Sequence, residues 1–94
     1  MGAVAKSIDN KLRARFAPQR LDIEDDSARH RGHAGYREEG ESHFRVEIVS
    51  AAFEGQSRIA RQRLVYQTLK DEFAAGLHAL ALTTLTPAED KAKA

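Results

Sequence analysis

Cysteine is absent from this chain of 94 residues. Its absence excludes disulfide bonds and thiolate nucleophiles, and it also excludes zinc ribbons and iron-sulfur clusters ligated by the chain's own thiolates. The four histidines are therefore the soft-metal ligands that the sequence offers. Aromatic residues are also scarce, at 6% of the chain, which weakens any prediction of a nucleic-acid-binding surface.

The sequence also lacks an excess of charge of either sign, because 15 Lys and Arg residues stand against 14 Asp and Glu residues. A net charge of +1 gives no overall field that would attract the chain to nucleic acid or to anionic lipid. No apolar run approaches the roughly 18 residues of a membrane span, and residues 1–6 lack the features of a signal peptide. We therefore expect a soluble, cytoplasmic protein with no membrane partner.

The N-terminal part predicts a helix and then a strand. Apolar residues recur every four positions from Val4 to Phe16, so they lie near one helical face until Pro18 stops the helix. Leu21 and Ile23 then alternate with acidic residues, which is typical of a short, half-buried strand.

The middle of the chain predicts a second strand after a long loop. Residues 25–41 are polar and glycine-containing, with no apolar period, so we expect a loop there. Apolar and charged residues alternate over 44–48, which is the clearest strand pattern in the chain. Ser57 suits the N-cap of the following long helix and Gly76 its end. A seven-residue repeat relates the apolar residues of that helix, which are Ile59, Tyr66, Leu69 and Phe73, flanked by Val65.

The C-terminal part predicts a third strand and a last helix. Residues 77–82 are mostly small or apolar on both strand faces, so we expect both faces to be largely covered. Thr86, Pro87 and Glu89 occupy the N-cap, N1 and N3 positions of a capping box. Residues 90–94 are expected to form a short or frayed tail.

The order helix, strand, strand, helix, strand, helix predicts an α+β fold, with a three-stranded sheet packed by helices on one face. Residues 1–94 form one domain, with a core over about 4–89. A helical crossover precedes the third strand, which favours parallel pairing with the second strand.

Three segments carry a resemblance to a known family. They are KLRARFAPQRLDIEDDS, SHFRVEIVSAAFEGQSRIARQRLVYQTLKDEF and GLHALALTTLTPAE. The motifs SHF, F-x-G, the arginine-rich helix start and HAL with TPAE lie in the order and spacing of the BolA family, so the sequence resembles that family from Lys11 to Glu89.

The resemblance implies a fold like the class II KH domain. It also implies an adaptor or regulator, not an enzyme, that binds a monothiol glutaredoxin and shares a [2Fe-2S] cluster with it and with glutathione, in iron-sulfur trafficking or iron regulation. The isolated chain is then expected to hold no cofactor. Some family members are DNA-binding transcriptional regulators of cell morphology and stress response, which is the alternative function. Homodimerisation is a further prediction left open.

Within the resemblance, His78 occupies the position of the C-terminal cluster ligand of the family. The second ligand of the family comes from the loop before the second strand, where this chain has His30 and His33. Counting from Ser27 favours His30 and counting back from Ser42 favours His33, so spacing leaves both. We interpret His43 as a surface imidazole, or one that supports a ligand, and not as a ligand itself.

Arg58, Arg61 and Arg63 cluster at the start of the long helix and are candidate contacts to a protein partner or to nucleic acid. Lys70 would join them in the DNA-binding alternative. Gln62 stands where the family usually has histidine, so any role that needs an imidazole there is in doubt. The only G-x-x-G spacing falls at 32–35, before the second strand, which does not support nucleic-acid binding by the KH route.

Overall fold

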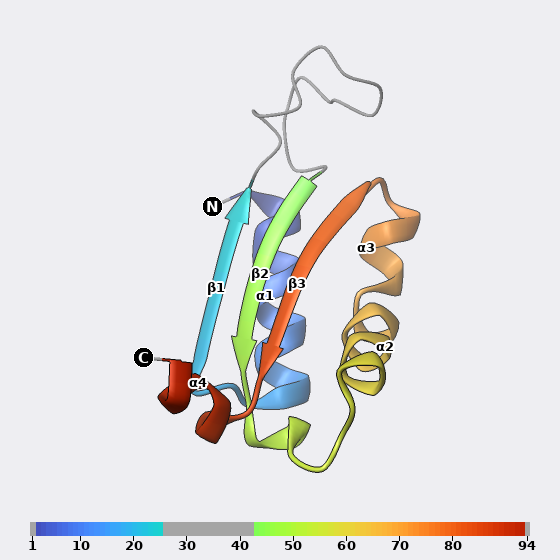
Figure 1. Ribbon diagram of the computed structural model, residues 1–94. Coiled ribbons are helices and arrows are strands. Elements are labelled where there is room, and N and C mark those ends of the chain that lie inside the picture. Colours follow the sequence, from blue (N-terminus) through green and yellow to red (C-terminus); the bar gives the residue numbers. More distant parts are fainter. Residues whose placement is uncertain (1, 26–42, 94) are drawn as a thin grey trace.

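The computed structural model describes residues 2–25 and 43–93 (Figure 1). The secondary structure follows the predicted order, with a short 3-10 turn added after the second strand. The elements are α1 (Ala3–Phe16), β1 (Arg20–Asp25), β2 (His43–Val49), η2 (Ala51–Phe53), α2 (Arg58–Thr68), α3 (Lys70–Ala74), β3 (Ala79–Leu85) and α4 (Pro87–Lys93).

The sheet has the order β1-β2-β3. Strand β1 pairs antiparallel with β2, with Arg20 opposite Val49. Strand β3 pairs parallel with β2, with His43 opposite Ala79, so the predicted parallel pairing is confirmed. A parallel neighbour needs a long crossover connection, and α2 and α3 supply it.

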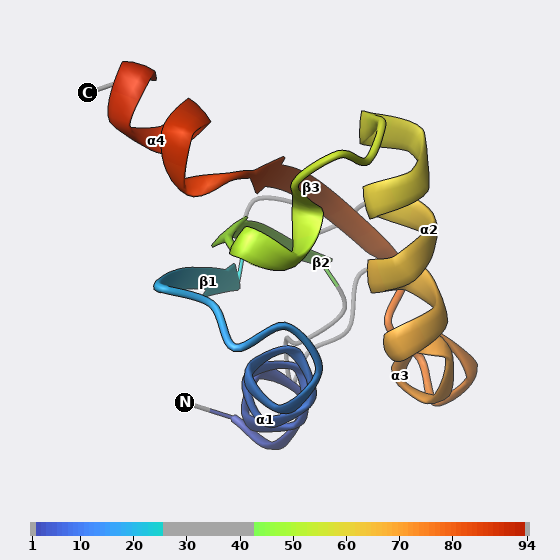
Figure 2. The ribbon, with the colours of Figure 1, turned by 90° about the horizontal axis from the view of Figure 1, so that it is seen from below.

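Helices α1, α2 and α3 lie on one side of the sheet, and α4 lies beyond the other side (Figure 2). Between the sheet and the three helices is an apolar core, in which the rings of Phe16 and Phe53 lie 5.1 Å apart. Its buried members are Ala5, Ile8, Leu12, Phe16, Phe44, Val46, Ile48, Phe53, Val65, Leu69 and Leu77. The α+β prediction with helices packed on a three-stranded sheet is thus confirmed.

Helix α1 ends where the sequence predicts. Ala17 takes a left-handed conformation with φ 44°, and its N–H donates to the carbonyl of Arg13. The buried Ser50 hydroxyl then ties this end to the sheet, because it donates to the Phe16 carbonyl at 2.6 Å.

The predicted long helix is two helices, which corrects the sequence analysis. Helical geometry is interrupted at Leu69, with φ −102° and ψ 15°, so α2 stops at Thr68 and α3 starts at Lys70. Gly76 follows α3 with φ 126°, as expected for a residue that ends a helix.

The apolar repeat of this region does not mark its buried face. Ile59 is 64% exposed and Tyr66 is 39% exposed. The side chains buried on α2 and α3 include two charged ones, and both have internal partners: Arg61, Val65 and Glu72, with Leu69 at the break. A hydrophobic pattern cannot reveal this face, because half of its turns toward the core are made by charged residues.

Glu72 joins α3 to α1. Its carboxylate accepts hydrogen bonds from the Ser7 hydroxyl and from Lys11 Nζ, the latter at 2.9 Å. Burial alone would raise the pKa of Glu72, but the hydrogen bonds from Ser7 and Lys11 outweigh it and hold that pKa below its usual value. The hydrogen bond to Glu72 in turn raises the pKa of Lys11. Both groups are therefore charged near neutrality.

The face of the sheet opposite the helices is largely open, which corrects the expectation that both faces of the third strand are covered. Ala79, Ala81 and Thr83 alternate along β3 on this face and are exposed. Only the far end of the face is covered, where Val49 and Leu85 are buried and α4 follows directly.

Ion pairs hold α4 to the rest of the domain. Arg20 bonds to Asp90 at 2.6 Å and to Glu47 at 2.5 Å, and Lys93 bonds to Glu47 at 2.6 Å. None of the side chains of α4 itself is buried. Where the sequence suggested a frayed tail from residue 90, the described part through Lys93 is helical and docked by charge.

Arg61 is the most buried of these charges, at 6% exposure. Its guanidinium grips the Glu89 carboxylate through two bonds, of 2.7 Å and 3.3 Å, and also donates to the carbonyls of Gln56 and Thr84. The predicted capping box is present, since Glu89 accepts from the Thr86 N–H and the Thr86 hydroxyl accepts from the Glu89 N–H. The hydrogen bond from Arg61 is the main reason that the pKa of Glu89 falls to about 2.

We predict that Arg61→Met destabilises the domain by about 3 kcal/mol, because it leaves two buried carbonyls and a carboxylate without their donor. Urea unfolding followed by circular dichroism measures the loss. The matched control is Arg63→Met, on the exposed side of the same helix, which should change stability by no more than about 0.5 kcal/mol. Equal losses in both variants would contradict a structural role specific to Arg61.

Candidate functional site

Two histidines meet at one edge of the sheet. His43 begins β2, and His78 immediately precedes β3, whose first residue Ala79 is paired with His43. The centroids of the two imidazole rings lie 5.3 Å apart, with an angle of 56° between the ring planes. Parallel pairing causes this meeting, because it brings the starts of both strands to the same edge.

The two imidazoles differ in exposure. His78 is exposed, whereas His43 is only 7% exposed. His43 alternates with the core residue Phe44 and therefore points toward the face opposite the helices. The interpretation of His43 as a surface imidazole is wrong, since it is buried. It lies instead against the predicted ligand His78, as a supporting imidazole would.

Strand β1 ends at the same edge, because Asp25 pairs with Phe44. The chain between Asp25 and His43 carries the other two candidate ligands, His30 and His33. Both lie outside the described residues, so the prediction that one of them is a ligand stays untested.

The described residues do not make a complete metal centre. Within 2–25 and 43–93, no group of three or more His, Asp or Glu side chains is close enough to hold a metal ion. The same ranges contain no helix long and apolar enough to cross a membrane. A tetrahedral iron or zinc ion at His78 would need ligands beyond this pair.

The three candidate arginines are separated by the fold. Arg58 and Arg63 are exposed on α2, but Arg61 is buried and fully engaged with Glu89 and two carbonyls. The assignment of Arg61 as a partner or nucleic-acid contact is therefore corrected, because its guanidinium faces the interior. Sequence spacing could not separate these residues, since burial depends on which side of α2 packs.

An exposed apolar feature of α2 was missed by the sequence analysis. Ile59 and Tyr66 lie on its outer side, and the Tyr66 ring packs edge-on against Phe73 at 5.6 Å. Near the start of the helix, Arg58 and Gln62 line a small hollow of about 140 Å³ with residues 82–85. This outer side of α2 is thus a mixed apolar and basic surface.

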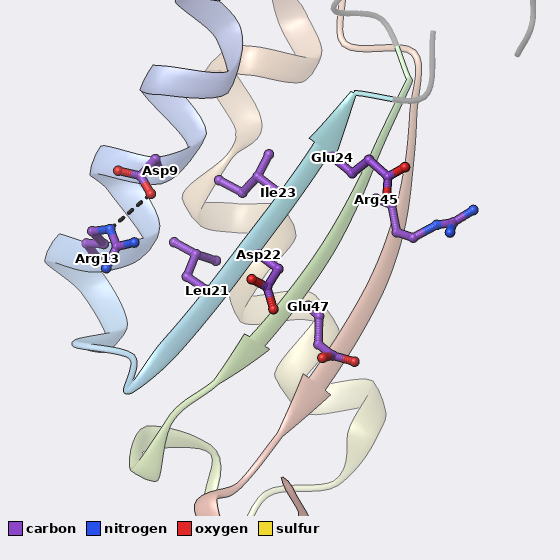
Figure 3. A pocket seen from close by; sticks show the side chains of 8 residues that line it. All are labelled: Asp9, Arg13, Leu21, Asp22, Ile23, Glu24, Arg45 and Glu47. Atoms are coloured by element: carbon purple, nitrogen blue, oxygen red, sulfur yellow. Dashed lines mark hydrogen bonds and ion pairs between the residues drawn. The ribbon is translucent and has the colours of Figure 1, made fainter. Parts of the chain in front are cut away.

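The largest hollow among the described residues, about 620 Å³, follows the edge strand β1 and does not include either described histidine. Figure 3 shows that its side chains lie on two sides of that strand, with Asp9, Arg13, Leu21 and Ile23 toward α1 and the others toward the open face. Its full lining is Asp9, Arg13, Leu21, Asp22, Ile23, Glu24, Arg45 and Glu47. Such a groove around a strand edge does not gather groups toward one point.

The fold and this edge define a class: a small α+β domain with a mixed three-stranded sheet, whose distinctive side chains are paired imidazoles at a strand edge and not an enclosed catalytic pocket. The family model for BolA-like proteins matches residues 12–89. The chain therefore belongs to the BolA family, which is a family of regulators and adaptors.

Relatives agree with this assignment. An uncharacterized protein in the cobS 5′ region of a Sinorhizobium species is 47% identical over 88 residues, covering 93% of this chain and 95% of that protein. The DNA-binding transcriptional regulator BolA of Escherichia coli is 43% identical, covering 88% of this chain and 75% of the regulator. Other relatives are longer, because the chain spans 25% of SufE-like protein 1 and 57% of BOLA1, both of Arabidopsis thaliana.

Solved structures agree as well. The BolA domain of SufE1 from Arabidopsis thaliana superposes with a TM-score of 0.86 at 44% identity, covering 95% of this chain and 98% of that one. BolA1 from the same plant gives 0.84 at 39% identity, with the same coverage of both chains.

The unequal burial of the two histidines predicts unequal effects on stability. We expect His43→Ala to destabilise the domain by about 2 kcal/mol, because it removes a buried ring, and His78→Ala to cost no more than about 0.5 kcal/mol. Urea unfolding of the two variants beside the parent protein measures both values. A larger loss for His78→Ala than for His43→Ala would contradict the described packing.

Proposed function

We propose that this protein is an adaptor that binds a monothiol glutaredoxin and ligates a [2Fe-2S] cluster jointly with it, in iron-sulfur cluster trafficking or iron regulation. The observation that carries the proposal is His78, an exposed imidazole at the sheet edge where β1 ends and β2 and β3 start. Family membership supports the same role.

The residues of this chain suit a shared cluster better than a resident one. With no cysteine in the sequence, the chain can offer only imidazole or carboxylate ligands to iron. His78 would supply one ligand, and His30 or His33 would supply the second. The remaining two would come from a glutaredoxin cysteine and from glutathione. Imidazole ligands of this kind raise the reduction potential of a [2Fe-2S] centre relative to thiolates.

The chain's own contribution is to position and expose the ligand. The β2–β3 pairing fixes the start of β3, and the packing of the His43 ring restricts where the His78 ring can lie. Exposure of His78 lets a second protein approach it. The apolar and basic outer side of α2, with Ile59, Arg63 and Tyr66, offers a surface for the protein contact.

We predict that anaerobic cluster reconstitution with a monothiol glutaredoxin and glutathione gives a visible circular dichroism spectrum that differs from that of the glutaredoxin alone. His78→Ala should abolish or alter this spectrum, because it removes a ligand from iron. His30→Ala and His33→Ala, made separately, identify the second ligand. A spectrum that is indifferent to this protein, or to His78, would contradict the proposal.

DNA binding is a second candidate function, because a relative that is 43% identical is named a DNA-binding transcriptional regulator. Arg58, Arg63 and Lys70 are exposed along α2 and α3 and could contact phosphates. Arg61 is excluded from that set by its burial.

For this candidate we predict that a gel-shift titration of duplex DNA shows affinity that falls steeply with salt. Each of Arg58→Gln, Arg63→Gln and Lys70→Gln should lower the slope of log affinity against log salt by about 1, because each removes one phosphate contact. The control is Arg13→Gln, an exposed arginine on α1, on a different element. Binding that is absent at low salt, or that Arg13→Gln weakens as much, would argue against DNA contact through α2.

A further inference from the structure

The proposed cluster function uses only one of the two described histidines. We propose that His43 and His78 together bind a single Zn²⁺ ion in the isolated chain. This site does not rest on the proposed function, since neither glutaredoxin nor an iron-sulfur cluster takes part in it.

The spacing of the two rings fits two ligands of one ion. Two imidazoles bound to one tetrahedral ion at Zn–N distances of about 2.1 Å have ring centroids roughly 5 Å apart. The observed separation between His43 and His78 is 5.3 Å, and the rings are inclined by 56° to each other, not stacked face to face. Only rotation of the side chains is needed to aim one nitrogen of each ring at a common point.

The backbone that carries the pair is well fixed. His43 is the first residue of the central strand and is held by pairing to Ala79, the residue after His78. Ligands on or next to paired strands keep their separation, and this lowers the conformational entropy that metal binding costs. The two faces of the site also differ usefully, because buried His43 gives a rigid anchor and exposed His78 gives an entry path.

The coordination left open sets the strength of binding. No third His, Asp or Glu of the described ranges joins the pair in a metal-sized group. Water would therefore complete the tetrahedron, as it does at zinc sites that keep an open position. Binding should accordingly be weaker than in a closed structural zinc site. Imidazole pairs favour Zn²⁺ and its first-row neighbours over Mg²⁺ or Ca²⁺, which prefer oxygen ligands.

The test is titration of the full chain with Zn²⁺ by calorimetry, and with Co²⁺ as a spectroscopic probe of coordination. We expect one ion per chain, and we expect His43→Ala and His78→Ala each to weaken Zn²⁺ binding by more than about tenfold. The double variant His30→Ala/His33→Ala, which keeps the described pair, should bind as the parent does. Mg²⁺ should give no heat of binding.

A second measurement separates ligation from a structural effect of His43→Ala. Nitrogen-15 spectra of the imidazoles of the parent protein should show large shifts for one ring nitrogen of His43 and one of His78 when Zn²⁺ is added. An unshifted His43, unchanged binding in His43→Ala, or loss of binding in the His30/His33 double variant would each overturn the site.

These outcomes are distinct from those of the cluster experiment. A cluster that requires His78 but not His43, together with no Zn²⁺ binding, would leave the proposed function standing without this site. Zn²⁺ binding by the pair, together with no shared cluster, would leave the site standing without the proposed function.

Discussion

The parallel pairing of β2 with β3 is the constraint on which the rest of the domain depends. Parallel neighbours cannot be joined by a tight turn, so the chain must cross over through α2 and α3, and this crossover covers one face of the sheet. The same pairing puts the starts of both strands at one edge. His43 and His78, 35 positions apart in the sequence, are neighbours for that reason alone.

The opposite face of the sheet is closed by charge where it is closed at all. Helix α4 has no buried side chain of its own, and ion pairs from Arg20 and Lys93 hold it against the end of the sheet. Arg61 reaches the same helix from the helical side, past Thr84, and so links the two faces. Exposed ion pairs contribute little each, whereas a buried, multiply bonded guanidinium is costly to disrupt, so Arg61 dominates this closure.

Sequence reasoning succeeded where a local pattern and the fold agreed. The period of four in α1, the alternation in β2 and the capping box at Thr86 are each set by nearby residues, and each is present. It failed where the deciding partner is distant. Arg61 is buried because Glu89 meets it, 28 positions along the chain, and the region after Ser57 hides two charges while exposing Ile59.

The site shows the same division in sharper form. His78 was found because its motif is recognisable in sequence, but nothing local marks His43 as its neighbour, since only strand pairing brings the rings together. One imidazole nitrogen cannot bind two metals at once. A zinc ion on the His43–His78 pair and a cluster ligated by His78 would therefore exclude each other. Glutaredoxin carrying a cluster would have to displace the zinc ion, so metal occupancy of the isolated chain would oppose formation of the shared complex.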